Sequence, residues 1–308
     1  MSYTHPYSQY SQPPYTQQPR YINKGKTFPS NPPQIYIGKR DKPFKELLKK
    51  LLTKSNIKSE EIDSLLDQEG LNMFSIAFTH ISANSNQHYE LYETLGDKTA
   101  NKCILWYFSK RFPHIFCYQG SDIITRIKIK YIQSDSFSEI SDHLGFWDYI
   151  SMSMETRNGN IKHKILEDVF ESFCAVVEIL LDKKFGLGAG YSACFHIISK
   201  IMDEMDISID YYSLNNPIMI LKEIYDELFT NGQRQKDDQL PLYSNRTVAD
   251  EFIVTIMDKV NREMVVMGTG KGKTLELAKQ DAAKQGINYF GKMGISKKIP
   301  DAYLKFCI

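Results

Sequence analysis

The chain has 308 residues, of which 42% are hydrophobic and 24% are charged, and its formal net charge at pH 7 is +1. That length leaves room for two packed domains and a tail, and the near-neutral charge excludes a basic field over the whole surface that would attract polyanions. No apolar run reaches the roughly 18–20 residues that cross a bilayer. The N-terminus also lacks the basic-then-apolar pattern of a signal peptide, so we expect neither membrane insertion nor secretion.

The five cysteines are scattered and odd in number, and none belongs to a C-x-x-C pair. This usage is typical of reduced thiols in an intracellular compartment, and it does not favour a disulfide framework or a zinc site. We therefore expect an intracellular, cytoplasmic protein. If the chain comes from a virus, that compartment is the cytoplasm of the host.

Residues 1–42 form the first segment of the chain and are rich in Tyr, Gln, Pro and Ser. Such a segment buries too little apolar area to offset the entropy that ordering would cost. It is predicted to be a disordered tail. An alternative interpretation is a sticky segment that mediates self-association or contacts RNA.

From residue 43 onward, apolar residues recur at steps of three and four, which predicts helices. The first of these patterns carries Phe44, Leu47 and Leu51, with lysines between them. The pattern predicts a helical domain over residues 43–205, followed by a polar linker over residues 206–216. The further helices are expected over residues 60–67, 71–82, 88–110, 120–133, 135–144, 162–182 and 189–204.

The last third of the chain combines two periodicities. Helical patterns cover residues 217–229 and 275–290, whereas alternating residues predict strands over 252–256 and 264–267, around a turn at 258–262. A short first strand is expected near residues 242–246. This order predicts a small α-β-β-β-α domain over residues 217–292, with a C-terminal extension over residues 293–308.

Two acidic clusters stand about seventy residues apart in helical patterns. Glu90, Glu93 and Asp97 share one helix face, and Asp168 and Glu171 share another, because residues three or four apart lie on the same side. Taken alone, each cluster is most simply the solvated face of an amphipathic helix. If the two clusters came together, their like charges would repel, and a cation between them would be needed. Oxygen-rich sites of this kind suit Mg²⁺.

The residues around these carboxylates form four motifs in a fixed order. The first motif is AFTHIS at residues 77–82, and the second is HYELYETLGD at residues 88–97. The third begins with ITRIK at residues 124–128 and ends with LGFWDYI at residues 144–150. The fourth is KILEDVFE at residues 164–171. The second motif resembles the signature of the ribonuclease III family, roughly H/N-E-x-L-E-F-L-G-D. The other three are similar to that family's A-L/F-T-H-x-S, L-S/T-x-L-R/K and K-I-x-x-D-V-F-E segments.

The resemblance implies a set of catalytic residues. The family's catalytic carboxylates match Glu93, Asp97, Asp168 and Glu171, and Glu90 matches a further acidic position. By this resemblance the four would hold Mg²⁺, for which Mn²⁺ can substitute, at the scissile phosphate of double-stranded RNA. The ion would generate hydroxide and neutralise charge on the leaving 3′ oxygen. The products would carry 5′-phosphate and 3′-hydroxyl ends with short 3′ overhangs.

The same resemblance implies an all-α nuclease domain that acts as a homodimer, each active site cutting one strand. Thr94 departs from the pattern, since the family has there a phenylalanine that inserts into the partner subunit. Loss of a buried aromatic residue at an interface removes a few kcal/mol of binding energy. We therefore expect a homodimer whose usual contact is weakened at Thr94.

The C-terminal domain has motifs of its own. Residues 217–223 fit P-x-x-x-L-x-E, and residues 270–283 are similar to the G-x-G-x-S-K-K-x-A-K-x-x-A-A segment of double-stranded-RNA-binding domains. Such domains recognise A-form duplex through 2′-hydroxyl and phosphate contacts. The resemblance implies that one glutamate contacts a 2′-hydroxyl and that three lysines contact phosphates: Glu223, Lys271, Lys273 and Lys279.

Two features weaken this expectation for the C-terminal domain. Leu275 and Glu276 stand where the motif has two lysines, and residues 217–292 carry eleven basic and eleven acidic residues, so the domain has no net attraction for phosphate. A structural or protein-docking role is the alternative.

For the whole chain, the leading hypothesis is a Mg²⁺-dependent endoribonuclease that hydrolyses double-stranded RNA. The alternative is a weak or inactive relative that serves as a structural RNA-binding component of a ribonucleoprotein.

Overall fold

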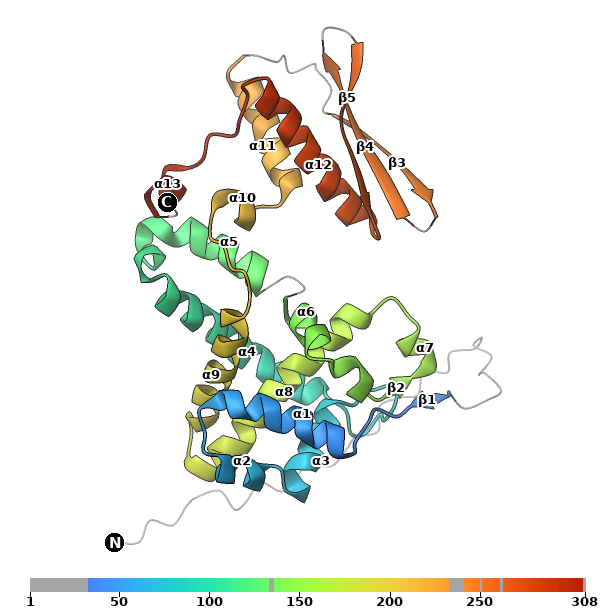
Figure 1. The fold of residues 1–308 in the computed structure, drawn as a ribbon, viewed down its shortest axis with the longest axis vertical. Coiled ribbons are helices and arrows are strands. Elements are labelled where there is room, and N and C mark those ends of the chain that lie inside the picture. Colours follow the sequence, from blue (N-terminus) through green and yellow to red (C-terminus); the bar gives the residue numbers. More distant parts are fainter. Residues whose placement is uncertain (1–32, 133–135, 233–240, 250, 261–262, 307–308) are drawn as a thin grey trace, which may run out of the picture.

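The computed structural model of the protein describes residues 33–132, 136–232, 241–249, 251–260 and 263–306. A helical domain fills the lower part of Figure 1, and a three-stranded sheet with two helices stands above it. Most of the tail predicted over residues 1–42 lies outside the described residues. Within the described part of the chain, no helix is both long enough and apolar enough to cross a membrane.

The helical domain confirms the helices predicted from apolar periodicity, with ends that differ by a few residues. Its centre is α8 (Lys162–Phe185), in which every residue from Asp168 to Val177 is buried. It packs against α3 (Gln68–Ala77), α4 (Glu90–Arg111), α6 (Ser136–His143) and α9 (Ala189–Asp203). The further helices of this domain are α1 (Lys42–Leu52), α2 (Ser59–Leu65), α5 (Ser121–Tyr131) and α7 (Met154–Arg157).

The end of the predicted tail is a correction, because residues 33–42 are ordered. In this segment β1 (Ile35–Tyr36) pairs antiparallel with β2 (Met152–Ser153). Arg40 follows, partly buried, and donates to the Ser75 side chain and to the carbonyl oxygen of Phe78. These partners lie far away in the sequence, so local composition could not reveal them. The domain also contains this two-stranded sheet and is therefore not entirely helical.

The stretch predicted as a polar linker contains a short helix, α10 (Tyr211–Leu214). The Asp210 side chain accepts a hydrogen bond from the backbone N–H of Ser213, which caps the first turn. The side chains of Tyr211 and Leu214 are both buried. Residues 206–216 are thus packed against their surroundings over part of their length, because two apolar residues sit among the polar ones.

The C-terminal domain has the predicted order of elements: α11 (Pro217–Thr230), β3 (Leu242–Val248), β4 (Glu251–Val260), β5 (Glu263–Gly272) and α12 (Leu275–Lys292). The strands form an antiparallel sheet in the order β3-β4-β5 and run further than predicted, since β4 continues through most of the expected turn. Small residues bring α12 close to β5. A Cβ atom at Gly270 would overlap the backbone of Ala282.

The C-terminal extension returns from α12 to the helical domain, where α13 (Asp301–Phe306) contacts α5 (Figure 1). Lys297 forms ion pairs with Glu223 and Glu227 of α11 on the way. Tyr303 is buried, and its ring meets the ring of Tyr211 edge-on at 5.2 Å. The extension therefore connects α11, α10 and α5.

We expect Tyr303→Ala to release the extension from the helical domain. Tyr303 is 5% exposed, and truncating a buried aromatic residue costs about 3–5 kcal/mol. Limited proteolysis should then cut the variant faster than the wild type within residues 206–216. Leu304→Ala is the control, because Leu304 is 47% exposed on the same helix. Equal cleavage rates in both variants would contradict this role.

Candidate metal centre

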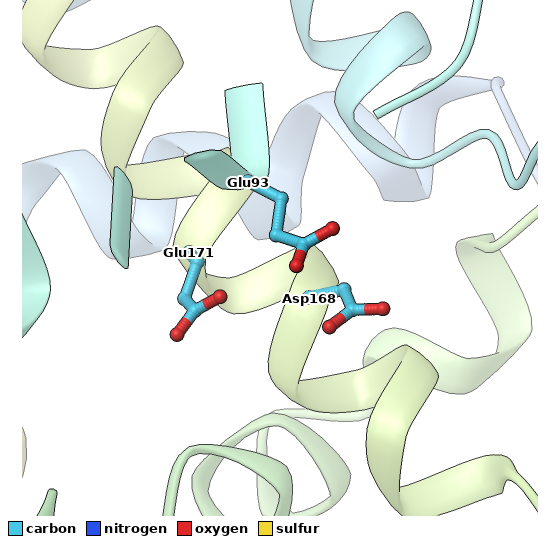
Figure 2. Close-up of side chains that lie close together, drawn as sticks. All are labelled: Glu93, Asp168 and Glu171. Atoms are coloured by element: carbon cyan, nitrogen blue, oxygen red, sulfur yellow. The ribbon is translucent and has the colours of Figure 1, made fainter. Parts of the chain in front are cut away.

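Three of the predicted carboxylates meet between α4 and α8. Glu93 comes from α4, and Asp168 and Glu171 come from α8, and one oxygen of each lies within 4.8 Å of the others. Figure 2 shows the three carboxyl groups gathered around a common space. Asp168 and Glu171 are only 6% and 5% exposed, so the alternative of a solvated acidic face is wrong for these two residues.

The two helices come this close because Gly96 has no side chain. A Cβ atom at this position of α4 would overlap the carbonyl oxygen of Glu171 and lie 3.2 Å from the backbone nitrogen of Ala175. Glu93 is three residues before Gly96 and therefore lies on the same side of α4. The glycine thus sets the distance between the carboxylate of α4 and those of α8.

The centre has an excess of negative charge. Burial, followed by the charges of Asp97 and Glu167, raises the pKa of Glu171 to about 8. Burial and the charge of Asp168 raise the pKa of Glu93 as well. Both shifts have the same physical cause, since carboxylates that leave water and approach one another favour their neutral forms. A cation among them would remove that penalty.

Lys164 is a positive group at the centre, and sequence reasoning did not single it out. Its Nζ lies 2.7 Å from Oδ1 of Asp168, 3.5 Å from Oε2 of Glu167 and 3.9 Å from Oε1 of Glu93. These carboxylates raise the pKa of Lys164, despite its partial burial. The spacing of four residues between Lys164 and Asp168 was the signal that could have identified this contact.

Two predicted acidic residues lie outside the three-carboxylate cluster. The Asp97 side chain accepts hydrogen bonds from the side chains of Lys98 and Asn101, which are on the same helix. Glu90 is exposed, and its Oε2 lies 3.8 Å from Nδ1 of His88. Local donors on α4 thus account for the position of the Asp97 carboxylate. Its role in the site remains a prediction.

The predicted RNA-binding residues have different surroundings. Glu223 accepts a hydrogen bond from the Tyr211 hydroxyl, and one of its oxygens lies 3.6 Å from Nζ of Lys297. Lys271 and Lys273 are exposed near the end of β5, and Lys279 is partly buried on α12. Lys271 and Lys273 are therefore on the surface, whereas Lys279 is partly covered and Glu223 already has partners within the chain.

The donor set of the cluster fits a hard divalent cation. Mg²⁺ and Mn²⁺ prefer oxygen ligands, and carboxylates supply all the ligand atoms in this cluster. Zinc sites usually include sulfur or imidazole ligands. Glu93, Asp168 and Glu171 are thus suited to hold an ion such as Mg²⁺, whose double charge would offset the repulsion among them.

Comparison with known proteins identifies the family. Residues 90–182 match a family model described as the Ribonuclease III domain, and this range includes all five predicted carboxylates. A protein of Invertebrate iridescent virus 6, provisionally named ribonuclease 3, is 30% identical over 290 residues, which cover 90% of this chain and 97% of that protein. The chain belongs to the ribonuclease III family. The family predicted from the four motifs is confirmed, and with it the enzyme class of endoribonucleases.

Other ribonuclease III relatives align over shorter ranges. A protein of Frog virus 3 (isolate Goorha), also provisionally named ribonuclease 3, is 32% identical over 248 residues, which cover 79% of this chain and 62% of that protein. Ribonuclease 3 of Ligilactobacillus salivarius (strain UCC118) is 28% identical over 235 residues, which cover 72% of this chain and 92% of the relative. Similarity to ribonuclease III proteins thus extends to both viruses and bacteria.

Proposed function

We propose that this ribonuclease III protein hydrolyses double-stranded RNA with a divalent cation bound by Glu93, Asp168 and Glu171. The observation that supports this most directly is the meeting of three carboxylate oxygens within 4.8 Å. Asp97 is one helical turn beyond Glu93, and its charge raises the pKa of Glu171. We assign it to the same centre, as a ligand whose carboxylate turns away from Lys98 and Asn101.

Mg²⁺ or Mn²⁺, when bound, would lower the pKa of the attacking water and offset charge on the leaving 3′ oxygen. Glu93, Asp168 and Glu171 orient the reacting groups, and Glu171 gives up its proton when the centre is assembled. Lys164 is exposed on the solvent side of the cluster, so its ammonium group can turn from the carboxylates to the scissile phosphate. Cleavage would leave 5′-phosphate and 3′-hydroxyl ends.

Short 3′ overhangs require two centres, so we propose that the enzyme acts as a homodimer. Leu91 and Leu95 are 71% and 49% exposed on α4, on either side of Thr94. An exposed apolar strip beside the carboxylates supports a contact between two copies of α4. Thr94 supplies less apolar area than the expected phenylalanine, so this dimer would be a weak one.

The C-terminal domain is the proposed second contact for the duplex. Lys271 and Lys273, near the end of β5, and Lys279 on α12 would bind phosphates, because basic side chains are the usual partners of phosphate oxygens. Glu223 would have to leave Tyr211 and Lys297 before it could contact a 2′-hydroxyl. The lysines therefore carry this part of the proposal, and Glu223 becomes available only if those contacts open.

The decisive experiment is incubation of the enzyme with long double-stranded RNA, in Mg²⁺ and in excess chelator. We expect cleavage in Mg²⁺ and intact RNA in chelator. Glu171→Gln should reduce the rate at least about 10³-fold, since the metal contributes several kcal/mol to transition-state stabilisation. Glu60→Gln on α2 is the control, because Glu60 is exposed outside the cluster. RNA that is bound but stays intact in Mg²⁺ would instead support a non-catalytic relative.

A further inference from the structure

Tyr89 lies beside the cluster and fixes one of its carboxylates. The Tyr89 hydroxyl donates a hydrogen bond of 3.1 Å to Oδ2 of Asp168. The other oxygen, Oδ1, faces the ammonium group of Lys164 at 2.7 Å. The two oxygens of Asp168 thus have different neighbours, one a buried phenol and the other the end of a flexible side chain that can move away.

Tyr89 is held in place through both its backbone and its ring. The backbone N–H of Tyr89 donates to the carbonyl oxygen of Thr79 at 3.0 Å, and its own carbonyl oxygen accepts from the Glu93 N–H and from the Ser172 hydroxyl. The ring of His80 meets the Tyr89 ring edge-on at 5.7 Å. The tyrosine is therefore anchored to the segment after α3, to α4 and to α8. The Tyr89 side chain is also buried, at 3% exposure, so the packing around its ring limits the movement of the hydroxyl.

The Tyr89 hydroxyl is the donor in its hydrogen bond to Asp168. A phenol carries its proton at neutral pH, whereas a carboxylate can only accept. A donor that is fixed in place and always protonated selects one rotamer of its carboxylate acceptor. Such outer contacts orient metal ligands in proteins, and their loss costs 10–100-fold in metal affinity.

We propose that Tyr89 is a positioning residue that holds Asp168 with Oδ1 free for the cation. The inference rests on the proposed function, because it assigns Asp168 as a metal ligand. It adds a residue that is neither acidic nor in contact with the ion. Without the phenol oxygen, the Asp168 carboxylate can rotate, and Lys164 can then pair with either of its oxygens.

The test is the binding of Mn²⁺ to the full-length protein in the absence of RNA, measured by calorimetry. Tyr89→Phe keeps the buried ring and removes only the hydroxyl, so the variant should fold. We expect its Mn²⁺ dissociation constant to rise about 10-fold or more. Tyr92→Phe is the matched control, since Tyr92 is a partly buried tyrosine in the first turn of α4, just after Tyr89, and its Mn²⁺ affinity should equal that of the wild type.

A role limited to packing predicts a different result. The Mn²⁺ affinity of Tyr89→Phe would then be unchanged, and that outcome would overturn the inference. A positioning role also predicts that cleavage by the variant returns to the wild-type rate at saturating Mn²⁺, with the KM for RNA unchanged. Wild-type protein that binds no Mn²⁺ would refute the metal centre itself. Failure of the proposed function is thereby distinguished from failure of the role of Tyr89.

Discussion

Gly96→Ala is expected to disable the metal centre although it leaves every carboxylate in place. The new methyl group would overlap the carbonyl oxygen of Glu171, and backbone on α8 cannot turn aside as a flexible side chain could. The two helices must therefore move apart. Overpacking of this kind costs about 1–3 kcal/mol, and displacement of catalytic groups by about 1 Å reduces rates roughly 10²-fold.

Two measurements check this expectation for Gly96→Ala. Calorimetry should show weaker Mn²⁺ binding than in the wild type, and thermal unfolding should show a lower midpoint. Gly291→Ala is the control, because a Cβ atom there meets nothing within 4 Å and alanine favours the helix. Wild-type Mn²⁺ affinity in Gly96→Ala would show that the close approach of α4 to α8 does not set the geometry of the site.

The helices could be predicted because their apolar residues follow the helical period. The pattern in residues 162–182 placed Asp168 and Glu171 on one face of α8. The spacing in residues 88–97 placed Glu90, Glu93 and Asp97 on one face of α4. Periodicity could not decide whether these faces meet water or each other. The family resemblance supplied that step, and the cluster of three carboxylates, two of them buried, agrees with it.

The features that sequence reasoning missed depend on contacts between distant residues. The pairing of β1 with β2 joins segments more than a hundred residues apart, and the hydrogen bond from Tyr89 to Asp168 spans 79 positions. No local pattern encodes either contact. Asp97, which the sequence placed with the other carboxylates, lies outside the cluster of three. Local contacts explain its position, because its hydrogen-bond donors, Lys98 and Asn101, are on its own helix.

Glu171→Gln is expected to stabilise the metal-free protein at alkaline pH, although it removes activity. The pKa of Glu171 is raised from its usual 4.5 to about 8, mainly by burial. Between these values the folded protein keeps a proton that the unfolded chain has released. Its stability therefore falls as pH rises through this window. Glutamine carries no charge at any pH, so the variant escapes this loss.

In excess chelator at pH 8.5, we expect Glu171→Gln to unfold at a higher temperature than the wild type. Its free energy of unfolding should be higher by roughly 2 kcal/mol, after allowance for partial solvation. At pH 5 the two proteins should unfold together. Saturating Mg²⁺ should reverse the order at pH 8.5, because an ion that binds only the folded state stabilises the wild type. If the free energies of unfolding of the two proteins changed in parallel with pH, burial and neighbouring charges would not destabilise the Glu171 carboxylate. In that case charge repulsion would not drive cation binding.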